Sequence, residues 1–493
     1  MIAHFPILVV VVLLISAAIV PIIGRRDWKI SWLWTVAATL VSLVLSLWLL
    51  HTVMQVGKIS YWLGGWEPPW GIEYAYDPLN AFVLSVVAFL AFVAAVYSKD
   101  VLPSEIEEQK IPFYYCMYIL FITGLMGMVA TGDIFNVYVF LEITSLAGYV
   151  LIGVSKNRQA LMASYTYLIL GTIAATFILL GIGYLYMATG TLNMADLGQR
   201  LPELYHSKVV LVGFAFLAVG LSIKVALFPL HNWLPNAYTY APSVTSVIMA
   251  ATATKVGAYV MIRMLFTVFN PQFEVVVIHL AELLLILSVV AILVGSVLAV
   301  AQTNIKKMLA YSSIGQIGYI TLGIALLNTT GLTGSVLHIL NHTLMKGALF
   351  MVAGAVVYRL GITSIRDFTG LGKKMPFTMA AFTVGALSMI GVPLTVGFVS
   401  KWYLAVGSLE AGMWYLLPVI LFSSLLTAVY FWRVIDNIYF KNPVEGSVAV
   451  GSGDAPAGVV IPAMTVAALC VVFGIFASWP VTVAQKAAGL LIR

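Results

Sequence analysis

The chain has 493 residues, of which 62% are hydrophobic and only 9% are charged. An ordinary soluble domain carries about 25% charged residues, so this composition excludes a soluble protein and indicates a polytopic membrane protein. The net charge of +6 does not indicate nucleic-acid binding, because the basic residues lie singly or in pairs between apolar runs. Cys116 and Cys470 lie alone in such runs, so we expect buried core residues, no metal site and no cofactor.

Apolar runs of the roughly 20 residues needed to cross a membrane follow one another along the chain. The first, 5–23, lacks the basic start and the cleavage site of a signal peptide and is expected to remain as a helix. The fold class is therefore an all-α polytopic membrane protein with about fourteen transmembrane helices. These are predicted at residues 5–23, 30–51, 78–98, 111–130, 134–154, 161–189, 208–229 (interrupted, continuing towards 240), 243–268, 275–301, 306–327, 331–359, 375–405, 413–439 and 457–479.

The distribution of Lys and Arg predicts the orientation. One set of loops holds 15 of the 25 basic residues, among them Lys306, and the other set holds six, among them Arg263. Because cytoplasmic loops carry the excess of Lys and Arg, the first set is placed in the cytoplasm and both termini outside the inner (cell) membrane of a prokaryote. On the outer side, 57–78 is predicted to form a short hairpin and 190–207 a loop with one amphipathic turn. A cytoplasmic linker is expected at 439–456.

The stretch 209–260 contains two lysines in apolar surroundings, Lys224 and Lys255, and Pro229 interrupts its first helix. A lysine at mid-membrane costs roughly 2.5 to 3.5 kcal/mol, and a proline there frees backbone groups that lipid cannot satisfy. Both are tolerable only inside protein or beside water.

A carboxylate is predicted near the middle of the fifth helix. Glu142 has Ser145 and Tyr149 on the same helical face, at i+3 and i+7. At that depth a carboxylate either pairs with a cation or remains protonated. Asp133, at the start of the helix, is expected to cap it.

The eleventh helix places His338, His342 and Lys346 at i, i+4 and i+8, as a stripe on one face. Histidine titrates near neutral pH, so such a stripe is able to relay protons. His342 and Lys346 are expected closer to the ends of the apolar run, and a structural role for each remains equally open.

The twelfth helix is interrupted around Pro393, and Lys401 follows the interruption. Two interrupted helices of opposite direction, the seventh and the twelfth, predict inverted repeats formed by helices 4–8 and 9–13. The corresponding segments are an N-terminal three-helix segment, a first repeat, a second repeat and a C-terminal helix. Their expected bounds are 1–110, 111–268, 275–440 and 457–493.

The buried charges do not balance. Four lysines, at 224, 255, 346 and 401, accompany the single carboxylate of Glu142. A structural ion pair explains Glu142 with Lys224 but leaves the other three lysines unexplained. Some of the lysines must therefore be neutral or hydrated, which makes them candidate proton carriers.

Six motifs carry a family resemblance. In chain order they read GDIFNVYVFLE, GLSIKVALFPLHNWLPNAYTYAPSVTS, TATKVGAY, NIKKMLAYSSIGQIGY, LHILNHTLMKGALF and IGVPLTVGFVSKWYL, between about 113 and 439. This pattern resembles the antiporter-like subunits shared by multisubunit cation/proton antiporters of the Mrp type, complex I and membrane-bound hydrogenases. The resemblance implies two inverted five-helix repeats and a proton-transfer row. The residues implied for that row are Glu142, Lys224, Lys255, His338 and Lys401.

Within this family, the length and the run LEITSLAGYVLIG are most similar to the D-type subunit of the Mrp antiporters. The function implied is that of a proton-translocating, non-enzymatic subunit of a Na⁺/H⁺ antiporter, with other membrane subunits as partners. An N-type subunit of complex I and a hydrogenase subunit remain alternatives. Neither the cation nor its route is predicted, although the lack of clustered intramembrane carboxylates favours protons alone in this chain.

The predicted mechanism has Lys224 alternating between an ion pair with Glu142 and proton transfer through Lys255 and His338 to Lys401. Lys346, His342 and His231 are secondary candidates, His231 as a gate at the cytoplasmic end. Two other classes remain open, a stand-alone solute/H⁺ symporter and a haem-binding electron carrier. The second is disfavoured because His231 and His279 lie near helix ends, where they do not face His338 or His342.

Overall fold

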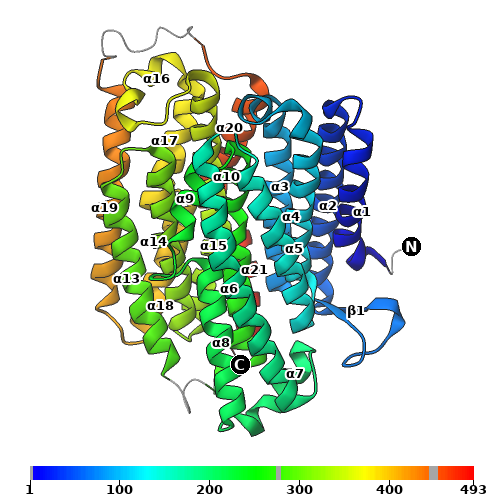
Figure 1. Ribbon diagram of the computed structural model, residues 1–493. Helices are drawn as coiled ribbons and strands as arrows, with labels where there is room; N and C mark the ends of the chain where they lie inside the picture. Colours follow the sequence, from blue (N-terminus) through cyan, green and yellow to red (C-terminus); the bar gives the residue numbers. More distant parts are fainter. Residues whose placement is uncertain (1–3, 272, 274–278, 443–452, 493) are drawn as a thin grey trace.

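A computed structural model describes residues 4–271, 273, 279–442 and 453–492 as a bundle of long helices (Figure 1). Residues 275–278, the predicted start of the ninth transmembrane helix, and most of the predicted 439–456 linker lie outside the described residues. The N-terminal helices are α1 (Phe5–Ile23), α2 (Trp28–Val56) and α3 (Pro78–Glu105). Helices 4–8 of the prediction correspond to α4 (Ile111–Ala130), α5 (Ile134–Gly153), α6 (Arg158–Thr189), α8 (Lys208–Val225) with α9 (Trp233–Tyr240), and α10 (Ser243–Ile248) with α11 (Thr254–Arg263).

Helices 9–13 correspond to α13 (Leu280–Val300), α14 (Ile305–Ala325), α15 (Thr329–Leu360), α17 (Pro376–Ile390) with α18 (Val396–Glu410), and α19 (Leu416–Tyr439). The last helices are α20 (Ala457–Ile475) and α21 (Ser478–Leu491). Twelve segments of the described chain are long and apolar enough to cross a membrane. Counting α14, and α17 with α18 as one broken span, gives fourteen transmembrane positions in these residues, so the predicted fold class is confirmed.

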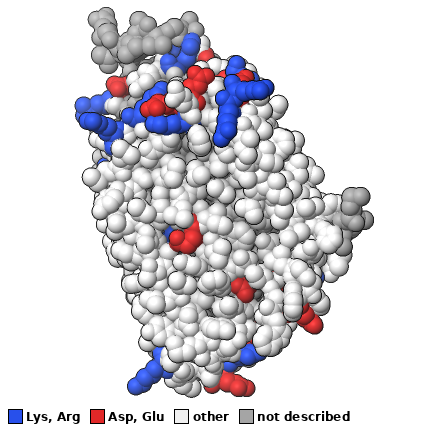
Figure 2. Space-filling view, turned by 45° about the vertical axis from the view of Figure 1, so that its right-hand side comes forward, with Lys and Arg blue, Asp and Glu red and all other residues white. Residues whose placement is uncertain are grey.

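The two ends of the bundle differ in structure. One end, which we call the hairpin end, carries strands β1 (Ile59–Trp62) and β2 (Glu73–Tyr76) and helix α7 (Met194–Arg200). The strands pair antiparallel, with Ile59 opposite Tyr76, which confirms the predicted hairpin. The opposite end, the loop end, carries α16 (Leu371–Lys374). Figure 2 shows Lys and Arg gathered at the loop end, above a broad band with few charges.

In each of the two groups of five helices, successive helices pack on one another in the same order. The helices of the two groups run in opposite directions. Helix α4 packs on α5, α5 on α6 and α6 on α8, while α13 packs on α14, α14 on α15 and α15 on α17 and α18. The first helix of each group runs the opposite way, because α4 begins at the loop end and α13 at the hairpin end (Figure 1). This arrangement confirms the inverted repeats of the predicted fold.

Matching loops strengthen this symmetry. At the hairpin end Asp133 pairs with Asn193 in an isolated bridge, and at the loop end Asn304 pairs with Ser364 in the same way. Asp133 caps α5 by accepting from the Asn136 amide at 2.7 Å, and Asn304 caps α14 by accepting from an amide three residues later at 3.1 Å. The predicted capping role of Asp133 is therefore confirmed.

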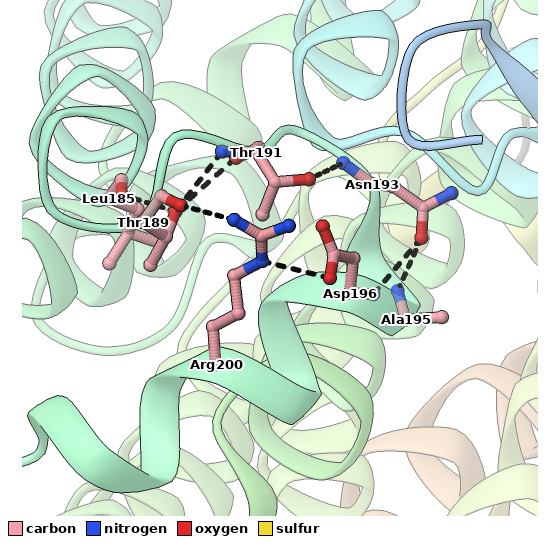
Figure 3. A network of polar contacts seen from close by, with 7 residues as sticks. All are labelled: Leu185, Thr189, Thr191, Asn193, Ala195, Asp196 and Arg200. Atoms are coloured by element: carbon pink, nitrogen blue, oxygen red, sulfur yellow. Dashed lines mark hydrogen bonds and ion pairs between the residues drawn. The ribbon is translucent and has the colours of Figure 1, made fainter.

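The hairpin-end loop after α6 is held by its own polar network (Figure 3). The Arg200 guanidinium bonds Asp196 at 2.9 Å and the Thr189 carbonyl at 3.0 Å, while Asn193 caps α7 through the Ala195 amide at 3.0 Å. The predicted amphipathic turn is thus a two-turn helix followed by the 3-10 turn Leu201–Leu204. Its network fixes the loop that carries the bridge to Asp133.

Both predicted interruptions occur. Helix α8 ends where Ala226 adopts a left-handed conformation with φ 59°, three residues before Pro229. Helix α17 ends at Gly391, with φ 91°, two residues before Pro393. Each proline thus lies inside the break and does not begin it. The left-handed residues terminate the helices as C-caps do.

Two departures from the prediction have simple physical causes. The fourteenth helix is broken at Phe476, because Pro480 has no amide to bond the Phe476 carbonyl in a continuous helix. The eighth contains two π-helical segments, Met249–Ala253 and Met264–Val268, on either side of α11. The pattern of apolar residues predicts neither the break at Phe476 nor the π-helical segments, because the residues on both sides of each feature are apolar.

Candidate functional site

The predicted site residues divide into two groups by burial. Lys255 is 1% exposed and Lys401 6%, and the stripe formed by His338, His342 and Lys346 on α15 is completely buried. The last two lie at the centre of α15 and not near its ends, which corrects that expectation. Lys224 and Glu142, in contrast, are partly exposed.

Lys224 lies in the last turn of α8, directly before the break. Its Nζ donates to Ser145 Oγ on α5 at 2.7 Å. Glu142 lies one turn from Ser145, and its buried Oε1 has no hydrogen-bond partner in the described part of the chain. No ion pair within 4.0 Å joins Glu142 and Lys224 among the described residues. The predicted partners are therefore neighbours, with the serine hydroxyl holding the lysine away from the carboxylate.

His231 lies in the break between α8 and α9, and the ring of Phe228 stacks on it at 5.2 Å. Its Nδ1 is buried and lacks a partner within the residues described. The Trp233 indole donates at 2.8 Å to the Ile223 carbonyl, which also accepts from the Ala226 amide at the end of α8. The break is thus packed by aromatic rings around one histidine.

Lys255 follows the first π-helical segment by two residues. Its Nζ donates to the carbonyl of Ala250, inside that segment, and the neighbouring carbonyl of Ala251 accepts from Thr343 on α15 at 2.8 Å. A π-helical turn leaves carbonyls free that an α-helix would occupy. The widened turn therefore satisfies a buried ammonium group without a carboxylate.

Helix α14 supplies partners for the α15 stripe. Gln316 Oε1 lies 2.9 Å from His338 Nε2, and Ser312 Oγ accepts from Lys346 Nζ at 2.5 Å. On its other side, His338 Nδ1 lies 2.8 Å from the hydroxyl of Ser400, the residue before Lys401 in α18. His338 therefore connects α14 to the second broken helix.

His342 lies between these groups. Its ring is stacked 5.9 Å from the His338 ring with 21° between the planes. Both of its nitrogens are buried without a hydrogen-bond partner among the described residues. Buried polar atoms are usually hydrogen-bonded, so an imidazole with two unpaired nitrogens is exceptional.

Lys401 uses the backbone released at the second break. Its Nζ donates to the carbonyls of Met389 at 3.1 Å and Ile390 at 2.9 Å, at the end of α17, and to Ser424 Oγ at 2.9 Å. It also lies 5.2 Å from the centre of the Tyr319 ring. A cation suits this position because the carbonyl end of a helix is negative.

These groups form a row with one gap, between Lys224 and Lys255. Lys255 lies within electrostatic range of His338, His342 and Lys346, and His338 within range of Lys401. At the other end of the row, Lys224 is within range of Glu142. Lys224 and Lys255 both belong to the first repeat, where α11 packs on α8 with Gly257 facing Val225, so they lie on adjacent helices without a direct contact among the described interactions.

Two residues assigned to loops by the prediction are instead buried. Lys306 donates to Ser243 Oγ at 2.9 Å, and Ser243 donates to Glu105 at 2.6 Å, at the loop end. Arg263 forms an ion pair with Asp77 at 2.6 Å near the hairpin end. They belong to helices and are not loop charges that set the topology.

The partners on α14 were also not predicted. Ser312, Gln316 and Tyr319 recur at i, i+4 and i+7, a spacing that puts polar groups on one face. Each contacts a different titratable residue of the row. That spacing, within the motif SSIGQIGY, could have predicted these partners from the sequence. No group of three or more His, Cys, Asp or Glu able to hold a metal occurs in the described ranges.

Two inverted helical units with broken helices and a row of buried lysines and histidines define an antiporter-like membrane subunit. The chain belongs to the NADH:quinone oxidoreductase/Mrp antiporter transmembrane family, whose model matches residues 131–427.

Known relatives come from different assemblies. The N subunit of NADH-quinone oxidoreductase from Desulforudis audaxviator is 45% identical, over 97% of this chain and 96% of that protein. The D subunit of the Na⁺/H⁺ antiporter from Bacillus subtilis is 29% identical, over 99% of this chain and 97% of that protein. A chain of the membrane-bound sulfane sulfur reductase, an archaeal respiratory membrane complex, superposes with a TM-score of 0.91 at 33% identity, covering 99% of this chain and 98% of its own.

Proposed function

We propose that this chain translocates protons as one subunit of a multisubunit membrane complex. The observation that carries the proposal is the row itself. It combines four lysines and two histidines in the membrane interior with one carboxylate, and neutral hydroxyl, amide and carbonyl groups hold most of them. Fixed ion pairs would immobilise protons, whereas such neutral partners leave the protons exchangeable.

The proposed transfer begins at Glu142 and Lys224. Rotation of the Lys224 side chain from Ser145 towards Glu142, one helical turn away, forms the ion pair, and the reverse rotation separates it. Since an adjacent carboxylate favours the charged form of lysine, forming the pair loads Lys224 with a proton and separating it promotes release.

Lys255 is the proposed next carrier, and it passes the proton to His338. The Ser400 hydroxyl, 2.8 Å from His338, directly precedes Lys401 in the chain and offers the next step. His342 and Lys346 form a parallel branch, with Ser312 as the partner of Lys346. His231 is a proposed gate, because it lies within the first broken helix.

The loop end is proposed to face the cytoplasm. Lys and Arg gather at this end on the face shown in Figure 2, as the positive-inside rule requires of a cytoplasmic side. The hairpin end, and with it both chain termini, would then lie outside a prokaryotic cell membrane. Because its relatives include a subunit of a Na⁺/H⁺ antiporter, we assign transport to this chain.

The first candidate assembly is a Na⁺/H⁺ antiporter in which this chain takes the position of the D-type subunit. The supporting observation is similarity over nearly the whole of the Bacillus subtilis protein. In this assembly the driving force for proton movement is a cation gradient. The proposed partners are other membrane subunits, H⁺ and Na⁺.

The second candidate is a redox-driven complex, in which electron transfer in other subunits moves the protons. Higher identity to an N-type oxidoreductase subunit and the close superposition on a respiratory reductase chain favour it. A hydrogenase-type assembly belongs to the same class. The proposed role of the row is identical in both candidates.

An affinity tag on this chain, in its native organism, allows both the proposed proton translocation and the type of assembly to be tested. We expect several membrane subunits to copurify and the reconstituted complex to acidify or alkalinise vesicles. A Na⁺ gradient drives this movement in the first candidate, and an electron donor with its acceptor drives it in the second. Solute-coupled transport by this chain alone, without partners, would contradict the proposal and support a symporter.

A further inference from the structure

A cavity of about 420 Å³ opens at the hairpin end, between the β-hairpin, α7, η6 (Met264–Val268) and the end of α21. Its wall contains both signs of charge, from Lys58, Glu73, Asp77 and Arg263. None of these residues belongs to the row described above. The cavity therefore needs an explanation of its own.

A polar stripe connects this cavity to the row. Lys255, Tyr259, Arg263 and Thr267 follow one another at intervals of four along α11 and η6. Residues four apart lie one above another on a helix. The last three members line the cavity, and the first is the central lysine. The stripe thus runs from mid-membrane to the hairpin end.

Hydrogen bonds join its middle members. Arg263 Nε donates to the Tyr259 hydroxyl at 3.0 Å, and this hydroxyl donates to the Val129 carbonyl at 3.0 Å. Arg263 Nη2 forms the ion pair with Asp77 at 2.6 Å. Beyond them, Thr267 Oγ1 is buried without a partner among the described residues. The stripe thus offers successive hydroxyl and charged groups on one helical face.

The carboxylates of the cavity wall already have hydrogen-bond partners. Glu73 accepts from Ser60 at 2.5 Å and from Asn193 at 3.0 Å. Asp77 also caps α3 through the Leu79 amide at 2.9 Å. Burial raises the pKa of Asp77, but Arg263 and the amide bonds outweigh it and hold the pKa below its usual value. Neither carboxylate is free to coordinate a metal cation, so the cavity suits water and protons.

We propose that this cavity is the opening through which the row exchanges protons with the hairpin side of the membrane. Tyr259 and the Arg263–Asp77 pair line the route between the cavity and Lys255. The inference rests on the proposed function, because it gives the proton path an exit.

The other repeat provides a contrast. Arg433 occupies the comparable place near the end of α19, and its guanidinium bonds the carbonyls of Val300, at 2.8 Å, and Gln302. It has no carboxylate partner among the described ion pairs. Arg433 thus fastens a loop, whereas Arg263 lines a charged cavity. This difference makes Arg433→Lys a matched control for Arg263→Lys.

The test uses the complete complex in sealed vesicles with the hairpin side accessible. In a background with Cys116→Ala and Cys470→Ala, Ala195→Cys introduces a thiol at an exposed position of the cavity wall. Gln55→Cys places one at the exposed end of α2, outside the lining. A charged, membrane-impermeant methanethiosulfonate reagent is then added. We expect both thiols to react, but proton transport to fall by roughly tenfold or more only in Ala195→Cys, relative to its own unmodified rate.

Two further variants make the inference falsifiable. Tyr259→Phe should lower transport by roughly tenfold, since it removes one hydroxyl from the relay, and Arg263→Lys should lower it more than Arg433→Lys. The proposed exit is overturned if Ala195→Cys does not react, if it reacts without loss of transport, or if Tyr259→Phe transports at the wild-type rate. Lys255→Ala distinguishes the two proposals. If Lys255→Ala loses transport but Tyr259→Phe keeps the wild-type rate, the exit alone is refuted. If Lys255→Ala keeps transport, the proposed function is refuted.

Discussion

The two repeats hold their broken-helix lysines in different ways. In the first, Lys224 precedes the break and bonds one serine hydroxyl, with the Glu142 carboxylate a turn away. In the second, Lys401 follows the break and bonds two carbonyls, a hydroxyl and the face of an aromatic ring. Lys224 therefore has one hydrogen bond and an alternative partner in the Glu142 carboxylate, whereas all the hydrogen bonds of the Lys401 ammonium group are made. We infer that the first repeat contains the movable element and the second a fixed relay.

The matched helix caps identify the chemical origin of this difference. Glu142 lies nine residues after the cap Asp133, and Ser313 lies nine residues after the corresponding cap Asn304. A carboxylate in one repeat is therefore a hydroxyl in the other. Within the described ranges, only the first repeat places a carboxylate where it is able to form an ion pair with its broken-helix lysine. The inverted symmetry of the backbone does not extend to the electrostatics.

The largest effect is expected from Lys224→Ala. Removing the movable carrier should abolish proton transport, a loss of roughly a hundredfold or more, because no other ammonium group lies near Glu142 in the described structure. The partly exposed position should still allow the complex to assemble, which copurification of its partners would check. Full transport by an assembled Lys224→Ala complex would show that the row does not carry protons.

Glu142→Gln compared with Ser313→Ala tests the asymmetry directly. The glutamine keeps the size of the side chain but cannot form the ion pair, so we expect a roughly tenfold or larger loss of transport. Ser313→Ala should cost far less, because its hydroxyl only bonds the Leu309 carbonyl of its own helix. Initial rates in vesicles measure both. Equal losses in the two variants would remove the distinction between a movable and a fixed repeat.

Gln316→Leu tests the fixed relay. His338 loses the partner of its Nε2, so the ring is no longer held towards Ser400, and transport should fall by about tenfold. Gln316→Glu restores an acceptor and should recover part of the rate. A shift in the pH dependence of transport, with unchanged assembly, would distinguish this positioning role from a general loss of packing.

Most of the fold was predictable because membrane helices are long and uniformly apolar. The bounds of α1 agree with the predicted 5–23, and both breaks were located from a proline beside a lysine. The break after α20 was not predicted, because Pro480 lies just beyond the expected end of the last helix. The π-helical segments were not predicted either, since their extra residues leave no compositional trace.

The site was predictable as a set of residues but not as a set of contacts. A lysine or histidine in an apolar run is conspicuous, so every member of the proposed row was a candidate from the sequence. Its partners are serines, a glutamine and main-chain carbonyls, which are ordinary in such helices. Ser145 separates Glu142 from Lys224, and this depends on side-chain geometry that spacing alone does not determine. Arg263 was misassigned because charges near helix ends resemble loop charges.

Tyr319→Leu should have a smaller effect than any of the changes above. It removes the aromatic face 5.2 Å from Lys401 Nζ, a contact worth about 0.5 to 2 kcal/mol, while the carbonyl and hydroxyl partners remain. Tyr319→Phe keeps the face and should be close to wild type. We expect a loss of a few-fold in the leucine variant, measured as the initial rate. A much larger loss in both variants would indicate that the Tyr319 hydroxyl takes part in transfer.

The smallest effect is expected at the matched caps. Burial raises the pKa of Asp133, although amide bonds from Asn136 and Phe135 oppose it. A carboxyl group whose pKa is raised in the folded state stabilises the fold at low pH. This contribution to the free energy of unfolding is lost as pH rises from the unfolded pKa of about 3.9 through the raised native value. Asp133→Asn keeps the cap, as Asn304 does in the other repeat, and should abolish this dependence with a change of under about 0.5 kcal/mol near pH 4. Asp133→Ala removes the cap and should cost about 1 kcal/mol. Thermal unfolding of the purified complex at several pH values measures both, and strong loss of transport in Asp133→Asn would mean that the carboxylate does more than cap α5.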